Sequence, residues 1–167
     1  MNFTKNLIFF EDTLFNLRNR IIFVDIDGTL LPDSESVLDA RVRESIYLLK
    51  KHNEVYLCTN SRNHIRNRKI EDQLDLKIIN LQHKKPSKKI ISSISPSNKK
   101  NFTVIGDKYL TDGLFAKNIG AEFILTKRKI SGNETWKIKL FNFIDDFIYN
   151  IVRFSLTLTK IWKAKTI

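Results

Sequence analysis

The chain has 167 residues, enough for one compact domain that buries roughly two-thirds of its unfolded surface. Its hydrophobic fraction of 42% and charged fraction of 28% are those of an ordinary globular protein, which argues against a disordered or fibrous chain. The net charge of +11 at pH 7 predicts a surface that attracts polyanions, or else an excess of lysine spread over a solvated surface.

The N-terminal segment favours a protein that stays inside the cell. Its unbroken apolar run, Leu7 to Phe10, is too short for a signal peptide, and the single Cys58 fits a reducing compartment. No run of about 18 uncharged apolar residues predicts a membrane-spanning helix. We therefore expect a cytoplasmic protein, with peripheral contact to a membrane as an open alternative. Residues 3–17 form a candidate amphipathic helix.

The next segments alternate between strand and helix patterns. Residues 21–31 (IIFVDIDGTLL) are typical of a buried strand that runs into a loop, and residues 34–52 carry apolar side chains at near-helical spacing. Residues 55–60 (VYLCTN) predict a second strand, and residues 77–81 (KIINL) a third candidate.

The alternation continues through the second half of the chain. A helix-like stretch at 90–94 precedes a strand at 102–107, a helix at 112–120 with Gly120 as its C-cap, and a strand at 121–126. Such alternation predicts an α/β fold with a mostly parallel sheet covered on both faces. Ligands in such sheets lie beyond the carboxyl ends of the strands.

Asp25 and Asp27 end the first strand, and Gly28 permits the loop that turns both carboxylates toward one pocket. Two carboxylates held together repel each other, so a cation is the usual reason for the pairing. An oxygen-lined site with few protein ligands suits Mg²⁺. The alternative is ordinary turn chemistry, because Asp and Gly are common turn formers.

Further polar residues lie at the ends of the other predicted strands. Thr59 suits a phosphate oxygen or a helix cap, and Lys85 suits a phosphate or plain solvation, with Lys84 as the competing lysine. Asp107 and Asp112, in GDKYLTDG, add carboxylates for a metal, although Asp112 could instead cap the following helix.

In order, DxDGT, Thr-Asn after a strand, Lys-Pro and GDxxxTD resemble the four motifs of the haloacid dehalogenase (HAD) superfamily of phosphatases, over roughly residues 21–126. The resemblance implies a three-layer Rossmann-like fold. It also implies that Asp25 is the nucleophile, which forms an aspartyl-phosphate, and that Asp27 is the general acid and base.

The same resemblance implies the remaining site residues. Mg²⁺ would be held by Asp25, the backbone carbonyl of Asp27 and Asp107, with Asp112 directly or through water. Thr59 and Lys85 would orient and neutralise the phosphoryl group. The candidate substrate-binding residues that complete the set are Gly28, Thr29, Asn60 and Lys84.

The intervals between the motifs, 30–56 and 60–84, each have room for about one helix, so we expect no cap domain. Among lidless relatives of subfamily IIIA, the chain is similar to the branch of YqeG-type proteins and mitochondrial phosphatidylglycerophosphate phosphatases. The resemblance implies an open site, suited to a phosphate on something large or to cover by another subunit.

The C-terminal segment is a candidate amphipathic helix, basic and rich in aromatic residues. It could lie on an anionic membrane surface, pack on the core or pair with a second copy in a homo-oligomer. We expect two parts: a phosphatase core with the N-terminal helix, 1–130, and a helical extension, 131–167.

The leading functional prediction is a magnesium-dependent phosphomonoester hydrolase, with phosphatidylglycerophosphate as the most specific substrate. Its partners would be a phosphorylated small molecule or a phospholipid headgroup. The alternative within the enzyme class is a phosphatase of a soluble sugar phosphate, a nucleotide or a nucleic-acid end. The alternative from another class is a catalytically quiet module whose basic face binds nucleic acid or a membrane.

Overall fold

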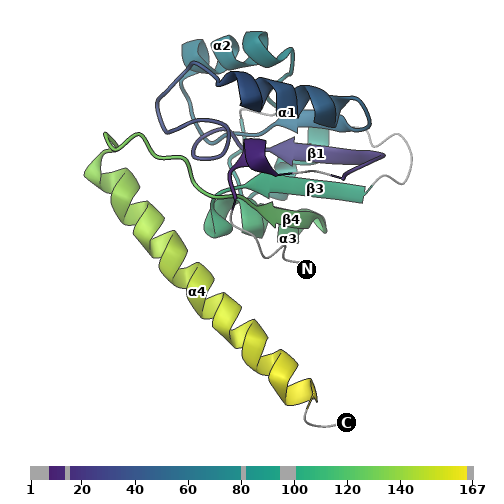
Figure 1. Ribbon diagram of the computed structural model, residues 1–167, viewed down its shortest axis with the longest axis vertical. Coiled ribbons are helices and arrows are strands. Elements are labelled where there is room, and N and C mark those ends of the chain that lie inside the picture. Colours follow the sequence, from purple (N-terminus) through teal and green to yellow (C-terminus); the bar gives the residue numbers. More distant parts are fainter. Residues whose placement is uncertain (1–7, 14–15, 80–81, 95–100, 165–167) are drawn as a thin grey trace.

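A computed structural model describes residues 8–13, 16–79, 82–94 and 101–164 of the chain, with the backbone alone for Ser93 and for residues 155–164. A four-stranded sheet in the order β2-β1-β3-β4 forms the centre of the fold (Figure 1), and every neighbouring pair is parallel. The strands are β1 (Arg20–Val24), β2 (Glu54–Leu57), β3 (Asn101–Gly106) and β4 (Glu122–Leu125). The predicted α/β fold with a parallel sheet is confirmed.

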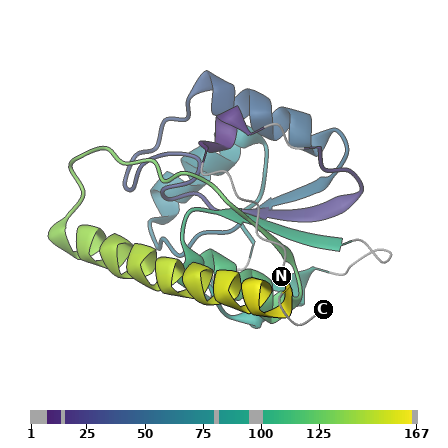
Figure 2. The same ribbon diagram turned by 60° about the horizontal axis from the view of Figure 1, so that its bottom comes forward.

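Helices cover both faces of the sheet (Figures 1 and 2). α1 (Ala40–Lys50) and α2 (His64–Leu74) lie on one face, and α3 (Leu114–Ile119) lies on the other. Side chains along β1 alternate between these layers, because successive residues of a strand point to opposite faces. Ile22 and Val24 pack with α1 and α2, whereas Ile21 and Phe23 pack with α3. The result is the predicted three-layer Rossmann-like, HAD-like fold.

The register of the sheet places the ends of three strands side by side. Val24, the last residue of β1, is paired with Leu57 of β2 and with Ile105 of β3. The segments after β1, β2 and β3 therefore leave the sheet at one edge. These are the segments that carry the predicted site residues.

Several predicted elements differ in extent or type. The helix expected at 34–52 begins at Ala40, because the side chain of Asp39 accepts a hydrogen bond from the Arg41 amide and caps it. The third strand candidate, 77–81, contributes only a bridge between Leu57 and Ile78, with residues 80–81 outside the described chain. The helix-like stretch near residue 90 is a 3₁₀ helix, Lys88–Ser93.

The N-terminal amphipathic helix predicted over residues 3–17 is not found in the described part of that segment. Residues 1–7 and 14–15 lie outside the description, and the rest contains a single 3₁₀ turn, Phe10–Asp12. Phe10 is fully buried in the core beside α1. This part of the segment therefore belongs to the packing of the domain.

The C-terminal helix is one long element, α4 (Trp136–Ala164), which runs beside the domain and extends past it (Figure 1). It contacts the core chiefly at a π-helical turn, η3 (Tyr109–Gly113), which follows β3. Within the described residues, no helix combines the length and the apolar character that a membrane span requires. The division into parts 1–130 and 131–167 stays a prediction.

Candidate active site

The polar residues predicted from sequence leave the sheet at its carboxyl edge. Asp25 follows β1, Thr59 follows β2 and Asp107 follows β3. Backbone hydrogen bonds continue the sheet for one more residue: the Asp25 amide donates to the Ile105 carbonyl at 2.9 Å. Parallel strands thus bring residues from distant parts of the chain to one site.

Gly28 forms a tight contact between the first loop and Asp107. It has φ of +87°, and a Cβ atom added to it would lie 2.5 Å from Asp107 Oδ2. A side chain there would therefore meet both backbone strain and a steric clash with a carboxylate. Because Gly28 has no side chain, the Asp107 carboxylate can pack directly against the backbone of the first loop.

We expect Gly28→Ala to destabilise the fold more than Gly132→Ala, which is a matched control. Gly132 has φ of +86°, but nothing lies within 4 Å of an added Cβ, so its substitution introduces the backbone strain alone. Strain of this kind costs about 1 kcal/mol, and the clash at Gly28 should roughly double it. Urea unfolding measures both values, and equal losses would show that the Asp107 contact relaxes freely.

Three buried carboxylates gather at the centre of the site. One carboxylate oxygen each from Asp25, Asp107 and Asp112 lies within 4.8 Å of the others. Lys85 compensates them: its Nζ forms ion pairs with Asp25 and, at 2.5 Å, with Asp112. Asp112 does not cap α3 with its side chain, since the N-cap residue is Gly113.

Asp27 lies beside this cluster, but its carboxylate pairs with residues outside the cluster. It accepts a hydrogen bond from Thr59 Oγ1 at 2.8 Å and forms an ion pair with Arg66 at 2.7 Å. Its backbone carbonyl accepts a hydrogen bond from Lys108 Nζ at 3.1 Å. The side chain and the carbonyl of Asp27 therefore face two different sets of partners.

The remaining predicted residues fall into two groups. Thr29 donates a hydrogen bond to Asp25 at 3.1 Å, and the Asn60 side chain exchanges hydrogen bonds with the backbone of Lys85, accepting from its amide and donating to its carbonyl. These two residues position catalytic candidates. Lys84, in contrast, is exposed and does not line the polar pocket that contains Asp25, Asp27 and Lys85. Of the two competing lysines, the structure brings Lys85 to the carboxylates.

The electrostatics of the cluster favour a bound cation. Burial raises the pKa of Asp25 well above its usual value, and the neighbouring carboxylates of Asp112 and Asp107 raise it further, while Lys85 opposes the shift. Burial alone would lower the pKa of Lys85, but Asp112 and Asp25 outweigh it and hold that pKa well above its usual value. A divalent cation beside these carboxylates would stabilise their ionised forms.

The charged residues of the site that were not predicted from sequence include Lys108, Arg128, Arg66 and Asp145, together with Asp33, which lines the pocket. Lys108 contacts Asp107 at 3.0 Å, and Arg128 Nε lies 2.6 Å from the same carboxylate. Arg128 follows β4, so the rule that sites lie at the carboxyl ends of strands could have drawn attention to it. Arg66 and Asp145 lie inside helices, where no sequence signal distinguishes them from surface charges.

Asp145 connects α4 to the segment that carries Asp107. Its buried carboxylate accepts hydrogen bonds from the Tyr109 amide at 3.0 Å and the Leu110 amide at 2.7 Å. It also lies 3.3 Å from Arg128, which in turn contacts Asp107. The long helix therefore supports the loop after β3 through a buried charge.

We expect Asp145→Asn to weaken this support. The amide keeps the size of the carboxylate but loses its charge, so hydrogen bonds worth about 1.5–3 kcal/mol to a charged group become weaker. The free energy of unfolding should fall, and Mg²⁺ should bind less tightly, as titration calorimetry would measure. Asp146→Asn is the control, because Asp146 also contacts Arg128 but is exposed. A loss of similar size in both variants would contradict a special role for Asp145.

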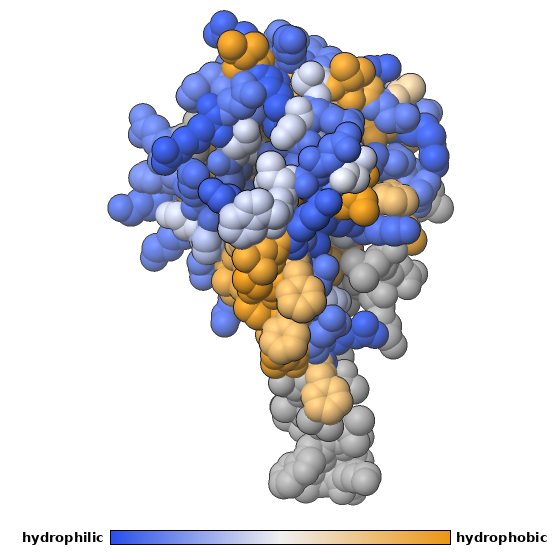
Figure 3. Space-filling model, turned by 90° about the vertical axis from the view of Figure 1, so that its left-hand side faces the viewer, coloured by the Kyte–Doolittle hydropathy of each residue, from blue (hydrophilic) through white to orange (hydrophobic). Residues whose placement is uncertain are grey.

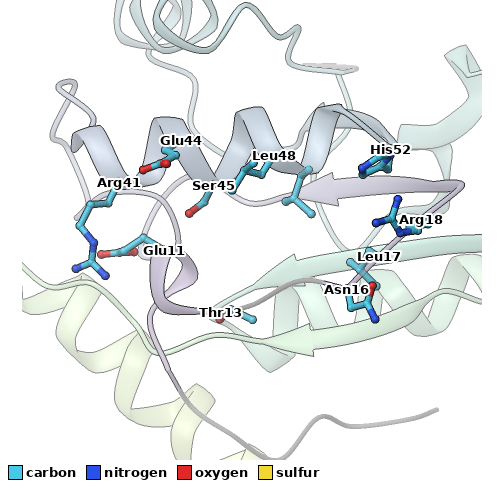
Figure 4. Close-up of a pocket in the computed structure, with 11 residues that line it drawn as sticks. Glu11, Thr13, Asn16, Leu17, Arg18, Arg41, Glu44, Ser45, Leu48 and His52 are labelled. Carbon is cyan, nitrogen blue, oxygen red and sulfur yellow. The ribbon is translucent and has the colours of Figure 1, made fainter.

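Of the three clustered carboxylates, that of Asp25 opens onto a polar pocket of about 480 Å³. Asp25, Asp27, Lys85, Lys108 and Arg66 line it, together with Phe141 of α4. A separate pocket of about 370 Å³ lies between α1 and the segment before β1 (Figure 4), and none of the carboxylates of the cluster lines it. The first pocket therefore joins the carboxylate cluster to solvent.

The donor set fits Mg²⁺. All candidate ligands are oxygen atoms: the carboxylates of Asp25, Asp107 and Asp112 and the carbonyl of Asp27. The ammonium group of Lys108 contacts both the Asp27 carbonyl and the Asp107 carboxylate. Two of the four candidate ligands thus already hold a cationic group in the structure, and the other two, Asp25 and Asp112, hold Lys85.

Fold and site define the class: a HAD-like α/β protein with an acidic centre at the carboxyl edge of its sheet. A family model described as mitochondrial PGP phosphatase matches residues 15–131, which is more than half of the chain. The chain belongs to this family, and it is therefore a phosphatase. No curated protein matches the chain.

The family description says mitochondrial, and the cytoplasmic location expected from sequence stays a prediction. α4 begins after the matched residues.

Proposed function

We propose that the protein is a magnesium-dependent hydrolase of a phosphomonoester, with phosphatidylglycerophosphate as its substrate, and that Asp25 carries the phosphoryl group during the reaction. The observation that carries this proposal is the pocket lined by Asp25, Asp27 and Lys85, together with the carboxylates of Asp107 and Asp112 that lie beside Asp25 behind it. The family to which the chain belongs supports the substrate, because PGP in its description denotes phosphatidylglycerophosphate.

In the first step, a carboxylate oxygen of Asp25 attacks phosphorus, and the bond from phosphorus to the glycerol oxygen breaks. Asp27 donates a proton to that oxygen as the alcohol leaves. In the second step, Asp27 takes a proton from water, whose oxygen attacks the phosphorus of the aspartyl-phosphate. The bond between phosphorus and the Asp25 oxygen then breaks, which releases inorganic phosphate and restores the Asp25 carboxylate. The contacts of Asp27 with Thr59 and Arg66 hold its carboxylate for both proton transfers.

Charge stabilisation comes from groups already in place. Lys85 is buried against Asp25, so its ammonium group can follow the negative charge from the carboxylate to the phosphoryl oxygens. Asn60 fixes the backbone of Lys85 on both sides of the residue. A fixed donor in a buried site needs little rearrangement as charge develops in the transition state.

Asp25, Asp107, the Asp27 carbonyl and Asp112 would hold the metal. Bound Mg²⁺ would neutralise phosphate oxygens and lower the repulsion between the phosphate and the carboxylates. The Asp112 carboxylate forms an ion pair with Lys85 in the structure, so we propose that it helps to bind the metal indirectly.

Membership of subfamily IIIA and the absence of a lid belong to the same proposal. The interval 30–56 contains α1, and the described part of the interval 60–84 contains α2. Each helix packs in the layer on the sheet, so neither extends over the pocket as a separate domain. An open pocket suits a phosphate that projects from a larger body.

Release of inorganic phosphate from detergent-dispersed phosphatidylglycerophosphate tests the proposal. We expect turnover with Mg²⁺, none with excess chelator, and recovery when Mg²⁺ is restored. Phosphatidic acid, glycerol 3-phosphate and a nucleoside monophosphate serve as comparison substrates at equal phosphate concentration. Faster turnover of a soluble phosphate would contradict the lipid substrate, and no turnover of any phosphate would contradict the assigned reaction.

A further inference from the structure

α4 is amphipathic in an unusual sense, because its most apolar face points away from the protein. Eight large apolar side chains in the described part of this helix are exposed to solvent, and all but Phe141 fall on the side opposite Asp145: Trp136, Leu140, Phe143, Ile144, Phe147, Ile151 and Phe154. We call them the outer face of α4. Figure 3 shows apolar side chains gathered along this helix, on the side turned to the viewer.

The opposite side of the helix is the one that contacts the core. Asp145 is buried, and Tyr149 packs against Tyr109 of η3 with a ring-centroid distance of 6.2 Å. Successive helical residues are turned by about 100°, so Phe143 and Phe147 fall nearly opposite Asp145. The docking of α4 therefore fixes its outer face toward the surroundings.

This arrangement points to a partner for the outer face. A surface helix of a globular protein normally turns its apolar side to the core and its polar side to water. Phe143 is 69% exposed and Phe147 is 59% exposed, and the apolar side chains one turn away, Leu140, Ile144 and Ile151, are also exposed. A contiguous exposed patch of this kind marks a site of contact with a protein or a membrane.

Charge distinguishes between these partners. Lys137 and Lys139 fall on either side of the outer face, and the whole chain carries a net charge of +11. In a pair of chains joined through α4, the lysines of both copies would approach each other, and two strongly cationic proteins would repel. An anionic bilayer offers apolar chains for the aromatic side chains and negative headgroups for the lysines.

The position of the pocket supports the same partner. Phe141, on α4, lines the pocket together with Asp25, Asp27 and Lys85. The helix therefore forms part of the pocket wall while it presents its apolar outer face to the surroundings. A surface bound by α4 would lie near the mouth of the pocket, where a lipid phosphate could enter without leaving the bilayer.

We propose that the outer face of α4 binds the surface of an anionic lipid bilayer and holds the open pocket against the lipid headgroups. This inference rests on the proposed function for the substrate that the bilayer supplies. The binding itself stands on the exposure of α4, its docking through Asp145 and its flanking lysines.

Vesicle flotation tests the binding. The full chain is mixed with vesicles of phosphatidylcholine alone or with phosphatidylglycerol added. The test variant is Phe143→Gln with Phe147→Gln. The control is Tyr47→Gln with Leu48→Gln, which removes two apolar side chains of similar exposure, 60% and 53%, from α1. We expect the native chain and the control to float with anionic vesicles, and the test variant to lose at least tenfold in affinity.

Two further measurements make the outcome decisive. Phosphate release from a soluble aryl phosphate should be the same for both variants, because neither alters a residue of the carboxylate cluster.

A native chain that fails to bind anionic vesicles, or a test variant that binds as well as the control, overturns the inference. So does a native dimer, seen by analytical ultracentrifugation, that the test variant converts to monomer. Binding without hydrolysis of any phosphate would overturn the proposed function and leave the bilayer contact standing.

Discussion

Asp25→Asn is expected to reduce phosphate release by at least about a thousandfold, because the amide cannot form the covalent adduct and no other carboxylate takes its place. Asn has nearly the size of Asp, so the packing around Thr29 and Lys85 should persist. Initial rates of phosphate release with saturating Mg²⁺ measure the effect. Circular dichroism confirms that the variant is folded.

Asp33→Asn is the matched control for this variant. Asp33 lines the same pocket, but it does not belong to the cluster of three carboxylates. We expect its activity to stay within about a factor of ten of the native value, because no bond to phosphorus depends on it. Residual activity of Asp25→Asn equal to that of Asp33→Asn would exclude Asp25 as the nucleophile.

Lys85→Met should have a large effect on both activity and stability. It removes the cation that is buried between Asp25 and Asp112, and removing one partner of a buried ion pair costs about 3–5 kcal/mol. Phosphate release should fall with it, because Lys85 faces the phosphate in the proposed reaction. Added Mg²⁺ should raise the melting temperature of this variant more than that of the native protein, because a cation would again compensate the carboxylates.

Lys84→Met is the natural comparison, since the two lysines are neighbours in the chain. Lys84 is exposed, so its replacement should change the free energy of unfolding by less than about 0.5 kcal/mol. Thermal unfolding with and without Mg²⁺, together with phosphate release, tests the pair. Equal effects of the two substitutions would contradict the assignment of Lys85 to the site.

The fold could be predicted from sequence because its strands are short apolar runs that end in polar residues. The pattern IIFVDIDGT predicts both the buried strand β1 and the loop that turns Asp25 and Asp27 outward. The position of Asp107 followed from the same rule, since parallel strands end at one edge, whereas Lys85 was predicted from the Lys-Pro motif. Local patterns and a single topological rule thus account for the centre of the site.

The rest of the site depends on tertiary packing that no local pattern encodes. Arg66 reaches Asp27 from α2, and Asp145 reaches the η3 turn from α4, across separations of 39 and 35 residues by their numbering. For the N-terminal segment, in contrast, a local pattern predicted a helix that the described residues do not form. Its apolar periodicity favoured a helix, but its described residues form a single 3₁₀ turn, and Phe10 at the start of that turn is buried in the core. Burial of one aromatic side chain outweighed the local preference.

Two glycines set the walls of the acidic centre. An added Cβ on Gly106 would lie 2.4 Å from the Asp112 carboxylate, as one on Gly28 would meet Asp107. Main chain, which cannot change rotamer, therefore confines both acids. The repulsion between the Asp107 and Asp112 carboxylates is therefore overcome when the polypeptide folds, and not each time an ion binds. An incoming divalent ion should consequently find its oxygen ligands already in position, which favours rapid and repeated exchange of metal and phosphate.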